Sequence, residues 1–187
     1  MAYVALACRL VIVGVFLVAA LTKVRSRASR DAFLSAVAAL VPATAPGPLG
    51  VLVVCVELAV AVLVALPWTV LPGLALAVGT LVAFGIAIWS ALRRGETVAC
   101  RCFGWSDAPV SRTHLVRNGA LVAIAAVGLV ARQAALAAGD AAVGGAAAPH
   151  PAGVAVSLAA AFVLVVVVTS LDDLVWLLGR TSPSGRA

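Results

Sequence analysis

Two cysteines separated by one residue, Cys100 and Cys102, have the clearest capacity for chemistry in this sequence. They lie in the segment VACRCFGWSD, residues 98–107, of a chain that is otherwise strongly apolar. A turn can bring two cysteines at this spacing within the roughly 4.4–6.8 Å between Cα atoms that a disulfide requires, although the resulting ring is cramped. Because strain makes a disulfide easier to reduce, the spacing favours an exchanging pair over a structural crosslink.

The residues around this C-x-C pair favour the thiolate, which is the reactive form of cysteine. A predicted helix begins near Ser111, so its partial positive charge lies just downstream of the pair. Gly104 gives the segment the freedom to fold back toward that helix end. The neighbouring basic side chains are Arg93, Arg94, Arg101, Arg112 and Arg117.

The helix predicted after the C-x-C pair carries polar side chains on one face. His114, Arg117 and Asn118 stand at positions i, i+3 and i+4, which are neighbours on a helix surface. We therefore expect these three residues to line the same site as the two cysteines.

Two other interpretations of the pair stay open. The cysteines can be unrelated residues of an interfacial loop, or two thiolates can bind Cu(I), or Zn with His114 and a fourth ligand. The only methionine is the initiator and no second Cys/His pair completes a tetrahedral set, so no metal site is predicted. The remaining cysteines, Cys8 and Cys55, lie in apolar runs and are expected to be packing residues.

The composition identifies the surroundings of the pair as a lipid bilayer. Of the 187 residues, 64% are hydrophobic and 11% are charged, with a mean hydropathy of +1.19, far outside the range of soluble domains. Five uncharged or nearly uncharged runs are each long enough to cross about 30 Å of hydrocarbon as a helix. They are 3–21, 49–66, 70–92, 115–136 and 153–171. The sequence predicts an all-α, polytopic membrane helix bundle with a four-span core and a fifth C-terminal span.

The chain divides into three parts on this pattern. Residues 1–138 form the four-span membrane domain, 139–152 an Ala/Gly-rich loop, and 153–187 the fifth span with a C-terminal tail. After the first span, residues 26–42 predict a short amphipathic helix in the membrane interface, with Ser29 or Asp31 as its N-cap and Pro42 at its end.

The basic residues predict the orientation of the chain. The net charge of +6 is distributed between loops, which does not suggest nucleic-acid binding. With five spans, 11 of the 13 basic residues fall on one side, in 23–30, 93–117 and 180–186. The positive-inside rule assigns that side to the cytoplasm. We expect a multi-pass protein of the cell membrane, with its N-terminus outside and both the C-x-C loop and the C-terminus cytoplasmic.

Arg9 and Glu57 are charged residues that lie inside predicted spans. A charge within the membrane is costly and is usually paired or functional. At a rise of 1.5 Å per residue, the heights of Arg9 and Glu57 along their helices can be compared from the same end of the bundle. The difference in height is one that an arginine side chain can largely span. We expect an intramembrane Arg9–Glu57 ion pair.

Several of these features together resemble the methylamine utilisation protein MauE family, a relative of the DoxX-like membrane proteins. The matching features are Lys23 at the end of the first span, the short helix ending at Pro42, Glu57, and the motifs CRCFG at 100–104 and RNGAL at 117–121. The resemblance covers about residues 3–136. It carries over Cys100 and Cys102 directly, whereas Arg101 replaces a glycine that is common in the family. The positions that carry over as motif positions are Lys23, Glu57, Phe103, Gly104, Arg117 and Asn118.

The resemblance implies a role in maturing or exporting the disulfide-rich small subunit of methylamine dehydrogenase, together with a thioredoxin-like partner. We therefore expect thiol–disulfide exchange at the C-x-C pair on behalf of an exported client protein. The alternative is a non-catalytic scaffold or small-molecule transporter of the DoxX-like type, in which Arg9 and Glu57 line a cavity. No cofactor is expected, and nothing in the sequence supports a quinone.

Overall fold

A computed structural model describes residues 2–42, 45–95, 111–137 and 150–180 of the chain, with the side chains of the last segment described up to residue 170. Within these residues all regular structure is helical. The helices are α1 (Ala2–Val24), α2 (Arg27–Leu40), α3 (Pro46–Ala65), α4 (Val70–Arg93), α5 (Arg112–Ala137) and α6 (Pro151–Arg180). All but α2 are long and apolar enough to cross a membrane, which confirms the predicted five-span, all-α bundle.

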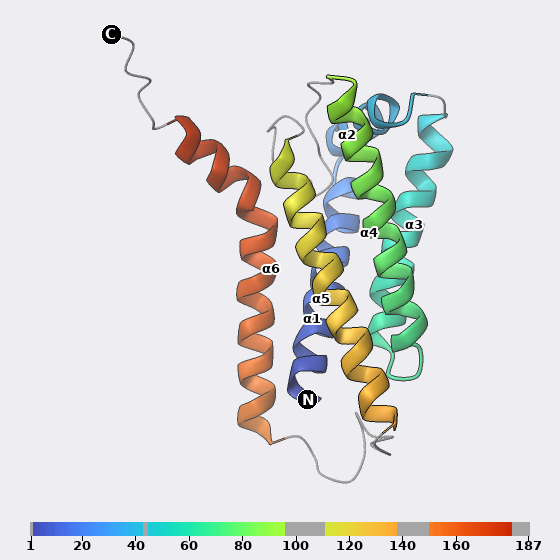
Figure 1. The fold of residues 1–187 in the computed structure, drawn as a ribbon. Helices are drawn as coiled ribbons and strands as arrows, with labels where there is room; N and C mark the ends of the chain where they lie inside the picture. The colour runs from blue at the N-terminus through green and yellow to red at the C-terminus, as the bar shows by residue number, and fades with distance from the viewer. Residues whose placement is uncertain (1, 43–44, 96–110, 138–149, 181–187) are drawn as a thin grey trace.

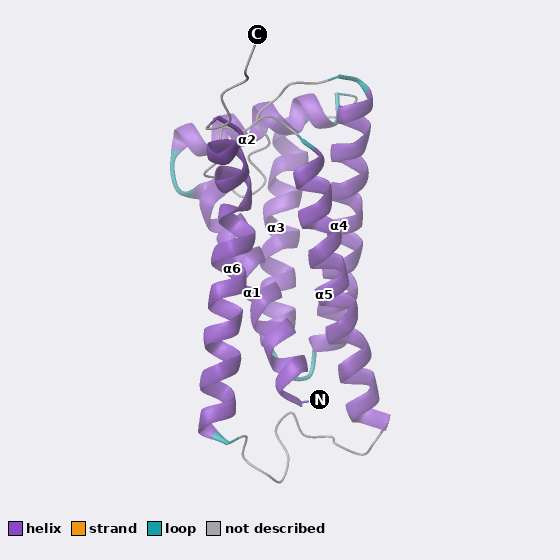
Figure 2. Ribbon diagram, turned by 60° about the vertical axis from the view of Figure 1, so that its left-hand side comes forward, coloured by secondary structure: helices purple, strands orange, loops and turns teal. Residues whose placement is uncertain are grey.

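The first helix is at the centre of the bundle. α1 packs against α3, α5 and α6, while α4 packs against α3 and α5 on the side away from α6. The five long helices run roughly along one axis, and α2 lies across one end (Figures 1 and 2). The structure therefore has a four-helix core formed by α1, α3, α4 and α5, with α6 attached mainly to α1.

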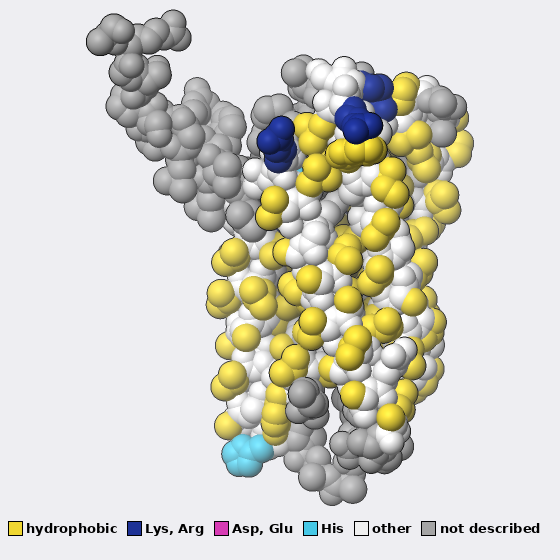
Figure 3. Space-filling model, in the orientation of Figure 1, with side chains coloured by type: hydrophobic (Ala, Val, Ile, Leu, Met, Phe, Trp, Pro, Cys, Tyr) yellow, Lys and Arg dark blue, Asp and Glu magenta, His cyan; other side chains and the backbone are white. Residues whose placement is uncertain are grey.

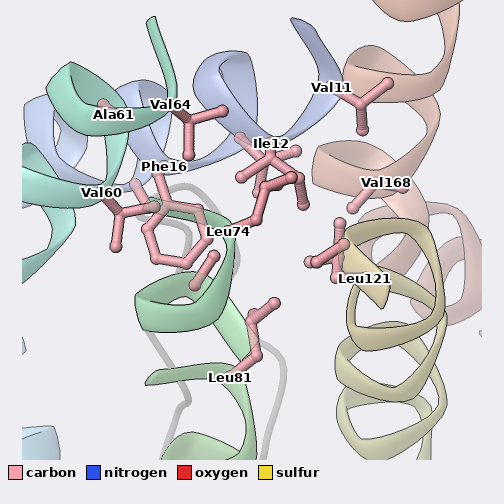
Figure 4. Close-up of a cluster of buried hydrophobic side chains, with 14 of the residues drawn as sticks. Val11, Ile12, Phe16, Val60, Ala61, Val64, Leu74, Leu81, Leu121 and Val168 are labelled. Atoms are coloured by element: carbon pink, nitrogen blue, oxygen red, sulfur yellow. The ribbon is translucent and has the colours of Figure 1, made fainter. Parts of the chain in front are cut away.

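Close packing between apolar side chains holds the four core helices together. Ile12 and Phe16 of α1 meet Val60 of α3, Leu74 of α4 and Leu121 of α5 in one cluster (Figure 4). All five side chains are buried, at 2% exposure or less. Since lipid is as apolar as these side chains, the cluster stabilises the bundle through complementary packing more than through removal of surface from water.

The contact between α1 and α6 depends on two glycines. A Cβ on Gly14 of α1 would lie 2.8 Å from Val165 of α6, and one on Gly153 of α6 would lie 2.4 Å from the Tyr3 ring. The Tyr3 hydroxyl also accepts a hydrogen bond of 3.1 Å from the backbone N–H of His150. Small residues at these points let the two helices approach closely, as is common between membrane helices.

The short helix α2 begins earlier than the sequence suggested. Its N-cap is Ser26, whose hydroxyl accepts a hydrogen bond of 3.0 Å from the Ser29 backbone N–H, so the prediction of Ser29 or Asp31 is wrong. The cap lies earlier because Arg27 already has helical geometry, which places Ser29 and Asp31 inside the helix. The helix ends at Leu40, just before Pro42, as expected.

Packing on one side and an arginine at one end fix α2 on the bundle. Phe33, Ala36 and Val37 are buried on its apolar side. At its C-terminus, the guanidinium group of Arg94 donates hydrogen bonds to the carbonyls of Ala39 and Leu40, at 3.1 and 2.9 Å. These carbonyls belong to the last turn, where helix carbonyls have no partner within the helix. Arg94 therefore joins the end of α4 to the end of α2.

The surface of the bundle has the character expected in a membrane. On the face shown in Figure 3, apolar side chains cover the side wall, while arginine side chains gather at the end that carries α2. The exposed basic residues near that end are Arg25, Arg27, Arg30, Arg93, Arg94 and Arg112. An apolar wall this continuous is far larger than the patches found on soluble monomers.

Candidate functional site

The most buried charged pair in the described part of the chain joins α1 to α3. The Lys23 ammonium donates a hydrogen bond of 2.6 Å to Oε1 of Glu57 and another of 3.2 Å to the carbonyl of Ala19. The two charged side chains are only 2% and 1% exposed. Lys23 is in the last turn of α1, and its side chain points back along the helix, as helical side chains generally do. This direction brings the ammonium down to Glu57.

The predicted Arg9–Glu57 pair is therefore wrong. Arg9 instead donates from Nε to the carbonyl of Val64 at 2.6 Å, and its Nη2 donates to the carbonyl of Ala65. Those carbonyls belong to the C-terminal turn of α3, about 12 Å along the helix axis from Glu57. Arg9 lines one small cavity and Glu57 another.

A third helix reaches the Lys23–Glu57 pair through an aromatic ring. The Lys23 ammonium lies 5.3 Å from the centre of the Phe33 ring of α2, within the range of a cation–π interaction. Lys23 and Phe33 together line two apolar cavities, one of about 320 Å³ against α3 and one of about 220 Å³ between α3 and α4. The pair therefore lies beside two spaces that an apolar molecule could enter.

The carboxylate of Glu57 is only partly satisfied. Its Oε2 is buried and has no hydrogen-bond partner among the described residues. A cavity of about 10 Å³ lies beside Glu57 and is otherwise walled by apolar side chains, including Phe16 and Leu81. This space is close to the lower limit for one water molecule.

The polar face predicted on the helix after the C-x-C pair is confirmed. His114, Arg117 and Asn118 are buried together on one side of α5, with 1–3% exposure. His114 Nδ1 lies 3.1 Å from the hydroxyl of Ser111, the residue that precedes α5. Neither the amide nitrogen nor the amide oxygen of Asn118 has a hydrogen-bond partner within the described segments. An amide buried in this way costs about 1–3 kcal/mol, so Asn118 is expected to serve a purpose other than stability.

The C-x-C pair itself lies outside the described residues, as do Arg101, Phe103 and Gly104. Its two connections are described. Gly95 follows α4 with a φ of 73°, a left-handed conformation that favours glycine, and Ser111 precedes α5. The C-terminal end of α4 and the N-terminal end of α5 lie at the end of the bundle that carries α2 (Figure 1). The described residues on either side of this segment are therefore the C-terminal end of α4 and the N-terminal end of α5.

Cys8 and Cys55 are free thiols on different helices. Cys55 is exposed and lines the larger apolar cavity, so the expectation that it is a packing residue is not met. Within the described residues, no group of three or more His, Cys, Asp or Glu could hold a metal ion. The proposed ligands Cys100 and Cys102 lie outside that part of the chain.

One charged residue was overlooked in the sequence. Arg132 lies inside the predicted fourth span, and in the structure its Nη1 is buried. A charged residue inside an apolar run is itself a sign of a paired or functional group, and this sign identifies Arg132 from the sequence.

Comparison with protein families gives one match. The family model described as "Methylamine utilisation protein MauE" matches residues 1–131, which include α1 to α4 and most of α5. Comparisons with curated proteins and with solved structures give no significant match.

Proposed function

The chain belongs to the MauE family, and on this premise we propose that it carries out thiol–disulfide exchange through Cys100 and Cys102. It is a multi-pass membrane protein of a family described by its part in methylamine utilisation. The exchange reaction, its client and its partner are the proposed part.

The buried polar face of α5 is the observation that carries this proposal. His114, Arg117 and Asn118 are nearly inaccessible, yet polar groups are costly inside a membrane bundle unless they serve a structure or a reaction. They lie within the first two turns of the helix that follows the C-x-C segment. A cationic side chain and a helix N-terminus beside a cysteine both favour its thiolate.

The proposed reaction transfers two electrons between dithiol and disulfide. The thiolate of one loop cysteine attacks a sulfur of the partner's disulfide, forms a mixed disulfide and releases the partner's other sulfur as a thiolate. The second loop cysteine then attacks the loop sulfur of the mixed disulfide and releases the partner's remaining thiolate. The loop pair ends as a disulfide, and the partner has gained two electrons and two protons. The reverse sequence oxidises the partner.

The partner class follows from the family assignment and from this chemistry. We propose a thioredoxin-like protein as the exchange partner, and an exported, disulfide-rich protein similar to the methylamine dehydrogenase small subunit as the client. The cell membrane is the proposed location. The exposed arginines near α2 support the assignment of this end, and of the C-x-C loop, to the cytoplasm.

Trapping the mixed disulfide tests the proposal. Cys100→Ser and Cys102→Ser each remove one of the two sulfurs, so one of these variants should accumulate a covalent partner adduct that dissolves on reduction. Cys55→Ser, which removes an exposed cysteine elsewhere, should behave as the wild type. If neither loop variant forms an adduct, the proposed exchange is wrong. Stoichiometric Cu(I) or Zn in the purified, reduced protein would support the metal alternative instead.

The cavities beside Lys23 favour a second candidate function, the binding or transport of a small hydrophobic molecule. Both apolar spaces are lined by Lys23, whose ammonium forms the buried ion pair with Glu57. Val53 lines the smaller space, so Val53→Trp should expel a hydrophobic molecule that copurifies with the wild type. Val62→Trp, on the exposed face of the same helix, should retain it. Equal retention by the wild type and both variants would contradict this candidate.

A further inference from the structure

Two arginines from different helices meet at the end of the bundle opposite α2. Arg9 of α1 and Arg132 of α5 line the same small cavity, which is otherwise walled by apolar residues such as Leu6 and Leu74. The helices approach closely here, because a Cβ on Gly128 of α5 would lie 3.2 Å from Cβ of Cys8. Both guanidinium groups are positively charged and line this one cavity, so they repel each other.

Arg9 is held in place by the backbone. Its Nε and Nη2 donate to the last carbonyls of α3, at Val64 and Ala65. These bonds satisfy helix-end carbonyls but supply no full negative charge. Arg9 therefore keeps its net charge inside the bundle.

Arg132 has a donor group that lacks a hydrogen-bond partner among the described residues. This group is Nη1, and it is buried. The carboxylates whose side chains the structure describes are those of Asp31 and Glu57. Asp31 belongs to α2 at the other end of the bundle, and Glu57 binds Lys23. No described carboxylate therefore balances the two arginines.

Two cations side by side, with no carboxylate among the described side chains to balance them, are costly in a membrane bundle, and a bound anion would offset this cost. We propose that Arg9 and Arg132 form a binding site for an oxyanion. An anionic oxygen would enter the cavity and accept a hydrogen bond from Nη1 of Arg132, while the positive charge of Arg9 stabilises it from the other side. Guanidinium groups suit this role because their planar N–H groups match phosphate and carboxylate oxygens.

The size and depth of the cavity narrow the choice of ligand. Its volume of about 10 Å³ admits one oxygen atom and not a whole phosphate ion. Arg9 lies about 10 Å from the start of α1 and Arg132 about 8 Å from the end of α5, within reach of the membrane interface. The ligand is thus a phosphate group that extends one oxygen into the cavity, and it can belong to an anionic lipid or to a soluble phosphate compound.

Ligand-dependent stability of the purified full chain in neutral detergent tests the site. We expect phosphatidylglycerol to raise the unfolding temperature of the wild type, and phosphatidylcholine to raise it much less. Inorganic phosphate in place of lipid distinguishes a soluble source, since only that source predicts a rise without lipid. If neither phosphatidylglycerol nor inorganic phosphate raises the unfolding temperature, the site is wrong and the cavity holds water only.

Matched variants separate this site from general surface attraction. Arg132→Gln should weaken the apparent affinity about tenfold or more, because it removes a charged hydrogen-bond donor. Arg132→Lys should restore part of that loss. Arg30→Gln removes an exposed charge on α2 and should leave the affinity nearly unchanged. An equal loss in Arg30→Gln and Arg132→Gln would contradict a specific site.

Discussion

The Lys23 ammonium and the Glu57 carboxylate lie 2.6 Å apart, each almost completely buried, and they connect the last turn of α1 to the middle of α3. Neither charge can be hydrated by bulk water at this depth. The stability of each therefore depends on the other, and the pair determines how the two helices are aligned along their axes.

Removing one member of this pair should destabilise the protein strongly. Glu57→Leu leaves a buried ammonium without its counter-ion, and we expect a loss of about 3–5 kcal/mol in the free energy of unfolding. Lys23→Met combined with Glu57→Leu removes both charges and should recover most of the loss. Thermal unfolding of the single and double variants in one detergent provides the comparison. Equal stability of wild type and Glu57→Leu would contradict the burial described here.

Asn118 should affect function more than stability. Asn118→Leu replaces a buried amide that lacks hydrogen-bond partners among the described residues by an apolar side chain of similar size, so we expect stability to be unchanged or raised by about 1–3 kcal/mol. If the face of α5 serves the C-x-C pair, the same variant should exchange more slowly with reduced thioredoxin. The unfolding temperature and the exchange rate are both needed. A large loss of stability would show that the amide is satisfied in the folded protein.

Arg94 should attach α2 to the bundle, whereas its neighbour Arg93 should not. Arg94→Ala removes two hydrogen bonds to the last carbonyls of α2, and we expect a loss of about 1–3 kcal/mol. Arg93 stacks on the Trp89 ring at 3.9 Å on an exposed surface, so Arg93→Ala is the matched control and should cost less. Thermal unfolding distinguishes the two variants. Equal losses would argue against the anchoring role of Arg94.

The proposed orientation predicts which thiols an impermeant maleimide reaches in intact cells. Cys8→Ser and Cys55→Ser together remove the cysteines of the spans and leave the loop pair. In this background the loop pair should be labelled only after the membrane is opened. Trp68→Cys places a thiol in the turn between α3 and α4, at the opposite end, and should be labelled in whole cells. Strong labelling of Cys100 and Cys102 in whole cells would contradict the proposed orientation and indicate the opposite one.

The sequence predicted the helices well because their signal is local. Five apolar runs and the short amphipathic segment after the first span are visible in composition alone, and all six appear in the structure. The shared face of His114, Arg117 and Asn118 was predictable for the same reason, since it depends only on the geometry of one helix.

The pairing of charges between helices was not predictable in this way. The sequence predicts Lys23 at the end of the first span, among the basic residues that orient the chain, but its long side chain extends back into the bundle to Glu57. Arg9 was paired with Glu57 from distances along the helices, which ignore how α1 and α3 are rotated about their axes. Arg9 instead satisfies the end of α3. Only the packed structure fixes these rotations.

The redox behaviour of the loop pair in purified protein tests the central claim most directly. In the Cys8→Ser, Cys55→Ser background, mass measurement after a mild oxidant should show the loss of two hydrogen atoms as Cys100 and Cys102 join. Reduced thioredoxin should then reverse the change. If both sulfurs stay reduced under oxidant and react with alkylating agents at the rate of an ordinary thiol, the exchange function proposed for this protein is contradicted.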